Sequence, residues 1–191
     1  MDPMRPYPLT PAICAAVLLA IPAPSTAGAD TVGPLAELVD AAAQRLQLAD
    51  DVAAAKWHTR TAIEDPARAD LQLTALTATA ETRRLDVGYV RRVFIDQIGA
   101  TEAVEHYRVA QWTLDPAAAP ADPPDLGASR TRIDDLNQVM LTRIEQSWPQ
   151  LHAPQCRSHL EQATRDVGAA RGFDGFARQA LSAATHSYCA G

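Results

Sequence analysis

Apolar residues recur at helical spacing along almost the whole chain after residue 34, and no stretch shows the strict alternation of a half-buried strand. Alanine is abundant, and it has the highest intrinsic helix propensity. The pattern predicts an all-α fold of about six helices in one domain. The expected helices span residues 34–59, 66–84, 87–115, 129–148, 154–171 and 174–189.

Helix boundaries are marked by capping residues and prolines. Asp65 precedes Pro66, which combines an N-cap with a proline in the first turn, and Asp86 is placed to cap the next helix. Residues 116–127 contain four prolines and three consecutive alanines. This composition predicts a stiff surface connection between two helices of one domain.

The last two helices carry a pair of cysteines at facing ends. A short turn at Gly172 predicts that these helices lie antiparallel, which brings Cys156 beside Cys189. We therefore expect a disulfide that closes the C-terminal helical hairpin. Two alternatives remain open: a pair of buried free thiols, and a metal site in which nearby histidines join the cysteines, namely His152, His159 and His186.

The first 29 residues have the composition of a signal peptide. Arg5 precedes the short apolar stretch 9–24, and Ala27-Gly28-Ala29 places small residues where a signal peptidase reads them. A membrane anchor is the competing interpretation, but the longest unbroken apolar run is 12–21, whereas a span needs about 20 apolar residues. We expect cleavage after Ala29, a helical domain of residues 30–191, and a secreted or periplasmic protein.

The charge balance excludes broad classes of partner. The chain carries a net charge of −6 at pH 7, so it has no general positive field for nucleic acid or for an anionic membrane. An anionic ligand must then be held by a local cluster of cations. Residues 30–191 contain fifteen arginines and one lysine, Lys56. An ordinary surface position would explain a single lysine, but its neighbours in the pattern suggest a site.

Polar residues repeat at helical spacing on the first two predicted helices. Arg45 lies eleven residues before Lys56, which places both on one face with their backbones about 16 Å apart. Asp65, Arg68 and Gln72 share a face of the next helix. Taken singly, Asp65 is explained as a helix cap and Arg68 as a surface charge. Their order along the chain is what suggests a shared site.

Two further positions complete the pattern. Thr101 and Glu105 are four residues apart on the third helix, and Arg130 lies near the start of the fourth. An ion pair with Arg108 would be the ordinary explanation for Glu105. The combined order is R-x10-K, D-x2-R-x3-Q, T-x3-E and a later arginine.

This order resembles that of the all-α (AroQ-type) chorismate mutases, and most of all their exported gamma subclass, which has a signal peptide, extra C-terminal helices and a disulfide. Residues 35–57, 91–108 and 118–130 show the likeness most plainly, and it extends to the terminal THSYC motif. The resemblance implies an isomerase that converts chorismate to prephenate, a step towards phenylalanine and tyrosine. It implies an intramolecular [3,3] rearrangement with no cofactor, no metal and no covalent intermediate. It also implies a homodimer with each active site inside one chain.

The resemblance also implies roles for individual residues. Lys56 is the first candidate for donating a hydrogen bond to the ether oxygen that gains charge as the C–O bond breaks, and Glu105 faces the same oxygen. A glutamate donates only when protonated, and the sequence leaves that state open. Arg45 joins these two as a catalytic residue. The substrate-binding set is Arg45, Lys56, Asp65, Arg68, Gln72, Thr101, Glu105 and Arg130, with Arg45 and Arg130 on the carboxylates and Asp65 near the hydroxyl.

A different class of function is an exported helical protein that acts by binding a host or envelope partner, with the mutase pocket as a secondary activity. The sequence gives this little support, because it contains no repeat, no heptad run and no large basic or aromatic patch. A helical transcriptional regulator is disfavoured by the export signal and the acidic balance.

Overall fold

The computed structural model describes Met1 and residues 33–189, and its helices all fall within one unit of the chain. The expected signal peptide and its cleavage after Ala29 lie outside the described residues. Within residues 33–189 every regular element is helical, which confirms the all-α prediction. The elements are α1 (Ala36–Thr59), α2 (Pro66–Thr82), α3 (Val87–Leu114), the 3-10 turn η1 (Pro116–Ala118), α4 (Leu126–Gln146), α5 (Trp148–Leu151), α6 (Cys156–Ala170) and α7 (Gly175–Ala184).

The α-helices number seven in the described part of the chain, one more than the sequence predicted. The extra helix is the four-residue α5, which begins at Trp148 with Pro149 in its first turn. The fourth helix also begins three residues earlier than expected, because the side chain of Asp125 caps it by accepting a hydrogen bond from the Ala128 amide at 2.7 Å. None of the described helices has the length and apolar character that crossing a membrane requires.

The two caps predicted from the sequence are both present. The Asp65 carboxylate accepts the Arg68 amide at 3.1 Å, and the Asp86 carboxylate accepts the Tyr89 amide at 2.6 Å. Each bond satisfies an amide that has no partner within its own helix. Asp65 thereby holds the start of α2 at the edge of the pocket described below.

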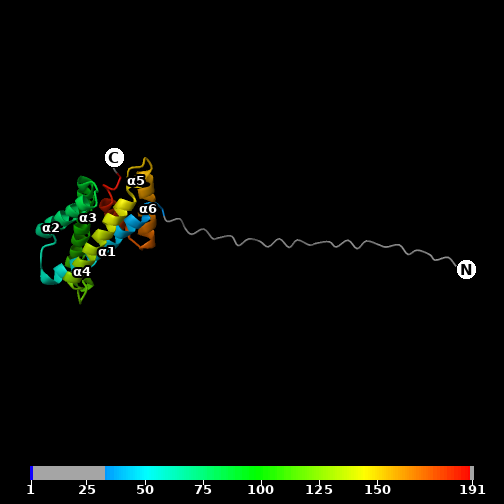
Figure 1. Cartoon of the computed structure of the whole chain (residues 1–191). Helices are drawn as coiled ribbons and strands as arrows, with labels where there is room; N and C mark the ends of the chain where they lie inside the picture. The colour runs from blue at the N-terminus through cyan, green and yellow to red at the C-terminus, as the bar shows by residue number, and fades with distance from the viewer. Residues whose placement is uncertain (2–32, 190–191) are drawn as a thin grey trace. The chain divides into compact units, whose positions relative to one another are not determined.

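Helix α1 forms the centre of the bundle and packs against α3, α4 and α6. Figure 1 shows α2 and α6 on opposite sides of the molecule, with α1 and α3 between them. Small side chains let neighbouring helices approach α1 closely, and larger apolar residues fill the remaining space. The buried alanines of α1 are Ala41, Ala42, Ala43, Ala49, Ala53, Ala54 and Ala55.

The C-terminal hairpin is closed as predicted. Gly172 adopts a left-handed backbone with φ of +65°, which turns the chain between α6 and α7. A disulfide joins Cys156 to Cys189, with the two Cα atoms 5.7 Å apart. Because the bond uses both sulfur atoms, the free-thiol and the thiolate metal-site alternatives are wrong. The segment after α7 is tied to α3, where the Tyr89 hydroxyl donates to the Tyr188 carbonyl at 2.6 Å.

Replacing both Cys156 and Cys189 by serine should lower the free energy of unfolding by about 3 kcal/mol, because the bond closes a loop of about 30 residues in the unfolded chain. Urea unfolding of the double variant and the parent protein measures this difference. Equal unfolding midpoints and slopes would contradict the prediction.

Candidate active site

A concave pocket lies among α1, α2, α3 and α4, and all eight residues of the predicted site line it. The structure therefore brings together side chains that are up to 85 positions apart, while their individual roles stay predictions. Val52, Ile63, Ile98 and Ile133 supply most of the apolar wall. The polar lining comprises Arg45 and Lys56 from α1, Asp65, Arg68 and Gln72 from the start of α2, Thr101, Glu102 and Glu105 from α3, and Arg130 from α4.

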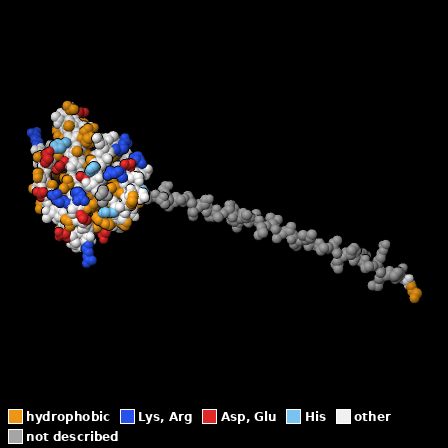
Figure 2. Space-filling model, turned by 90° about the horizontal axis from the view of Figure 1, so that it is seen from above, with side chains coloured by type: hydrophobic (Ala, Val, Ile, Leu, Met, Phe, Trp, Pro, Cys, Tyr) orange, Lys and Arg blue, Asp and Glu red, His pale blue; other side chains and the backbone are white. Residues whose placement is uncertain are grey.

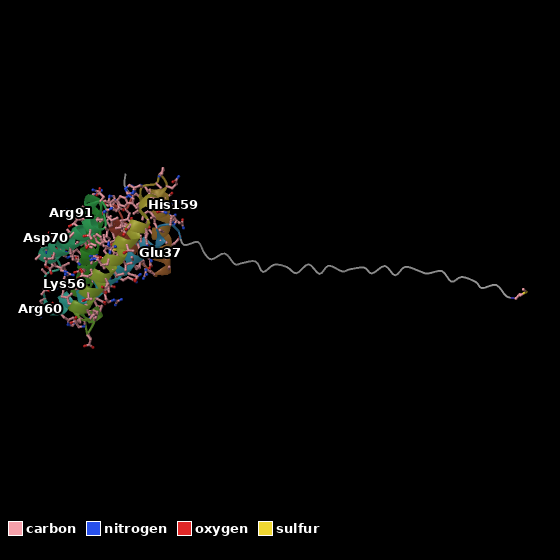
Figure 3. The ribbon with its side chains drawn as sticks, viewed as in Figure 1. Glu37, Lys56, Arg60, Asp70, Arg91 and His159 are labelled. Atoms are coloured by element: carbon pink, nitrogen blue, oxygen red, sulfur yellow. A yellow bond between two sulfur atoms is a disulfide. The ribbon has the colours of Figure 1, made fainter. Side chains whose placement is uncertain are left out.

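Lys56 is buried in this pocket, with only 7% of its surface exposed. Its Nζ donates to Glu105 Oε2 at 2.8 Å and also to the carbonyl oxygen of Ile63. Figure 3 shows Lys56 in the part of the molecule that also carries Arg60 and Asp70. The interpretation of Lys56 as a surface lysine is therefore wrong. A buried ammonium with two fixed acceptors is oriented in a way that an exposed lysine is not.

Glu105 is 3% exposed and pairs with Lys56 across the interface between α1 and α3. Burial raises the pKa of Glu105, and it outweighs the hydrogen bond and the charge of Lys56, which act to lower that pKa. The ordinary explanation for Glu105, an ion pair with Arg108, is wrong, because Arg108 pairs with Asp50 at 2.6 Å.

Arg45 is 2% exposed and is held by three acceptors from two other helices. Its Nε donates to Asn137 Oδ1 at 2.8 Å, and its Nη1 donates to Thr101 Oγ1 at 2.8 Å and to the Gln97 carbonyl at 3.3 Å. Burial lowers the pKa of Arg45 to about 10, so the guanidinium remains charged at neutral pH. Among the described residues, Nη2 has no hydrogen-bond partner.

The α2–α4 side of the pocket is formed by ion pairs. Arg130 donates to Asp65 Oδ2 at 2.9 Å, while the other oxygen of Asp65 caps α2. Arg68 Nη2 donates to both oxygens of Asp134 at 2.7 Å, and Gln72 Nε2 donates to Asp134 Oδ1 at 3.2 Å. These pairs are partly exposed, so salt and water weaken them more than the buried Lys56 pair.

The sequence pattern missed two residues that hold the site together. Asp134 and Asn137 lie on α4, four and seven positions after Arg130, and they contact Arg68 and Arg45 respectively. Their spacing from Arg130 is the same helical period that revealed the other positions. That spacing was a usable signal, although it does not say which side chain on another helix each one meets.

The pocket gathers four cationic side chains beside the carboxylates of Asp65, Glu102 and Glu105. Arg45, Lys56, Arg68 and Arg130 converge on one cavity in a chain whose net charge is −6. Figure 2 shows acidic and basic side chains interspersed over the face in view. An arginine fork matches a carboxylate, and a compact ammonium matches a single oxygen. The fold and the site thus define an all-α protein whose pocket holds cationic side chains in fixed positions.

Comparisons with known proteins agree with this class. The family model for chorismate mutase type II matches residues 36–106. The secreted chorismate mutase of Mycolicibacterium smegmatis is 54% identical over 163 residues, which cover 85% of this chain and 90% of that protein. The secreted chorismate mutase of Mycobacterium tuberculosis is 48% identical over 184 residues, which cover 95% and 92%.

Solved structures show the same likeness. The crystal structure of chorismate mutase from Burkholderia thailandensis superposes with a TM-score of 0.77 at 32% identity and covers 82% of this chain and 99% of its own. The chain therefore belongs to the chorismate mutase family. Seven of the eight predicted site residues fall within the matched residues 36–106, and Arg130 lies beyond them on α4.

Proposed function

We propose that the pocket around Lys56 converts chorismate to prephenate by holding the substrate in a compact shape and stabilising the charge that develops during rearrangement. The main support for this proposal is that the buried Lys56–Glu105 pair and the buried Arg45 line the same pocket. Membership of the chorismate mutase family gives that arrangement its reaction. The chemistry transfers no group to the protein, so the side chains act only by orienting and by donating hydrogen bonds.

Substrate shape is the first task of the site. Chorismate carries two carboxylates, and its enolpyruvyl side chain must fold over the ring before the new C–C bond forms. Arg45 and Arg130, on different helices, are proposed to bind the carboxylates and hold that folded shape. The Nη2 of Arg45 lacks a partner among the described residues, and Arg130 uses only one nitrogen on Asp65, so both retain donors for the substrate.

Charge stabilisation is the second task. As the C–O bond breaks ahead of C–C bond formation, negative charge develops on the ether oxygen. An ammonium has three N–H donors, and Lys56 uses two of them on Glu105 and the Ile63 carbonyl. The third is then fixed in direction before the substrate arrives. We assign this donor to the ether oxygen, and a protonated Glu105 would supply a second.

Glu105 gives this proposal a pH dependence. Because burial raises the pKa of Glu105, the protonated donor persists to higher pH than for an ordinary glutamate. Activity should decline as pH rises through that pKa. Replacing Glu105 with glutamine supplies a donor that does not titrate, so the alkaline limb of kcat/KM against pH should flatten. The exposed Glu145→Gln serves as the control, and an unchanged limb in Glu105→Gln would assign the decline to another group.

A direct assay tests the proposed reaction. The purified protein, with a chelator present and no nucleotide added, should consume chorismate, as followed by its ultraviolet absorbance. The rate should be proportional to protein concentration. Consumption no faster than in buffer alone would overturn the proposal.

We also propose that residues 1–29 are a signal peptide and that the enzyme is secreted or periplasmic. The support is the apolar stretch 9–24, the Ala27-Gly28-Ala29 motif, the disulfide, and the word "secreted" in the names of both relatives. The mass of the exported protein should correspond to an N-terminus at Asp30. A protein that retains residues 1–29 would contradict this cleavage.

A homodimer is proposed from the family resemblance. Sedimentation equilibrium at micromolar concentration should give twice the mass of one chain. A mass equal to one chain would refute the dimer.

A further inference from the structure

Asp134 does not line the pocket and is not one of the predicted site residues, but it contacts two residues that do line it, Arg68 and Gln72. Its carboxylate accepts two hydrogen bonds from Arg68 Nη2, both at 2.7 Å, and one from Gln72 Nε2 at 3.2 Å. Asp134 belongs to α4, whereas Arg68 and Gln72 belong to α2. One carboxylate therefore fixes two pocket residues of a neighbouring helix.

The geometry leaves part of the Arg68 guanidinium available. Both bonds to Asp134 use Nη2, so Nε and Nη1 make no hydrogen bond with any described residue. The Nε is buried and has no partner among residues 33–189. An unpaired buried donor on a charged group is costly, but this Nε is inaccessible to solvent, so Nη1 is the nitrogen left to bind an anionic ligand in the pocket. Asp134 thus fixes one end of the guanidinium while Nη1 remains free.

We propose that Asp134 is a positioning residue for the substrate, because it orients Arg68, and with it Gln72, towards the bound dianion. This inference rests on the proposed function and deepens it. An arginine side chain has many rotamers, and immobilising it during binding costs free energy. Asp134 restricts those rotamers before the substrate binds. The contact persists in the ground state and in the transition state, so its removal should act on KM rather than on kcat.

The opposite expectation comes from charge alone. A carboxylate close to a pocket for a dianion repels it, and removing that carboxylate would then lower KM. Asp134 is also close enough to Arg45 for its negative charge to raise the Arg45 pKa, although burial has the larger and opposite effect. Positioning through Arg68 predicts that Asp134→Ala raises KM only when Arg68 is present. Simple repulsion predicts a lower KM, and an effect through Arg45 predicts the same change in KM with and without Arg68.

The test measures kcat and KM for chorismate in the wild type, Asp134→Ala, Arg68→Ala, the double variant and Asp134→Asn. Asp134→Ala should raise KM about fivefold with kcat within about twofold of the wild type, the scale of one partly exposed ion pair. In the Arg68→Ala background, the same substitution should change KM by less than about twofold. Asp134→Asn keeps an acceptor without the charge and should give an intermediate KM.

Control variants isolate the effect. Asp135 is the next residue on α4, is exposed and has no hydrogen bond among the described side chains, so Asp135→Ala and Asp135→Asn should match the wild type. Asp134 is itself 49% exposed in its side chain, so its variants should keep the unfolding temperature of the parent protein.

Three results would overturn the inference while the proposed function stands. These are an unchanged or lowered KM in Asp134→Ala, an equal rise of KM with and without Arg68, and a rise of the same size in the Asp135 variants. Absence of chorismate turnover by the wild-type protein would overturn the proposed function and this inference with it.

Discussion

Replacing Lys56 with alanine should lower kcat at least about 100-fold, the usual scale for losing one preorganised donor to a developing charge. KM should change much less, because the lost interaction strengthens only as the ether oxygen gains charge. Lys56→Met offers a matched variant that retains most of the buried side-chain volume and lacks the ammonium. Steady-state kinetics of both variants should show a similar fall in kcat. Agreement between them attributes the fall to the charge rather than to a cavity beside Glu105.

A change confined to KM in both Lys56 variants would contradict the assigned role. It would place the ammonium on a part of the substrate whose charge is the same before and during the reaction. A fall in kcat for Lys56→Ala alone would instead indicate a packing defect.

Replacing Arg45 with lysine should lower kcat/KM at least about 100-fold, even though the charge is kept. The guanidinium satisfies Asn137, Thr101 and the Gln97 carbonyl and still retains donors for the substrate. A single ammonium has three donors in a compact head group and does not reproduce this planar fork. The ammonium of the Arg45→Lys variant would leave some of these buried acceptors unpaired, and each unpaired acceptor costs about 1–3 kcal/mol.

The exposed Arg132 on α4 provides the matched control for this substitution, and Arg132→Lys should stay within about twofold of the parent protein. Steady-state kinetics with chorismate, together with thermal unfolding, separate catalysis from stability. A kcat/KM within about tenfold of the parent for Arg45→Lys would show that a point charge suffices at this position.

Much of the fold followed from the sequence because its determinants are local. Asp65 and Asp86 were identified as caps from their place before an apolar periodic run, and both accept the predicted amide bonds. The Cys156–Cys189 disulfide followed from two helices joined by the short turn at Gly172. Helix α4 begins earlier than the sequence predicts, because Asp125, at the end of the proline-rich stretch, caps it.

The candidate site was foreseeable to the extent that helical spacing places residues on one face. Spacing grouped Arg45 with Lys56, and the structure places both in one pocket. It did not identify partners on other helices, such as Asn137 for Arg45, 92 positions along the chain. The burial of the Lys56–Glu105 pair is likewise a property of the packed bundle, and so is the resulting rise in the Glu105 pKa.

The buried charges of the pocket carry a cost for folding. Lys56 and Arg45 are nearly inaccessible to water, and burying an ion costs several kcal/mol before its partners offset the loss, while burial favours the neutral form of Glu105. Each of the three has hydrogen-bond partners among the described residues, which offset part of that cost. The surrounding helices supply the remaining stability. Such an arrangement suits a site whose groups must be in place before the substrate binds.

The most direct test of the central claim is a time course of chorismate followed by proton NMR and mass spectrometry. A chelator is present, and the parent protein and Lys56→Ala are compared at equal concentration. The parent protein should convert chorismate to prephenate in a one-to-one ratio, with no change in mass, because the rearrangement is intramolecular. Lys56→Ala should do so at least about 100-fold more slowly. A product of different mass, or equal rates for the two proteins, would contradict the account.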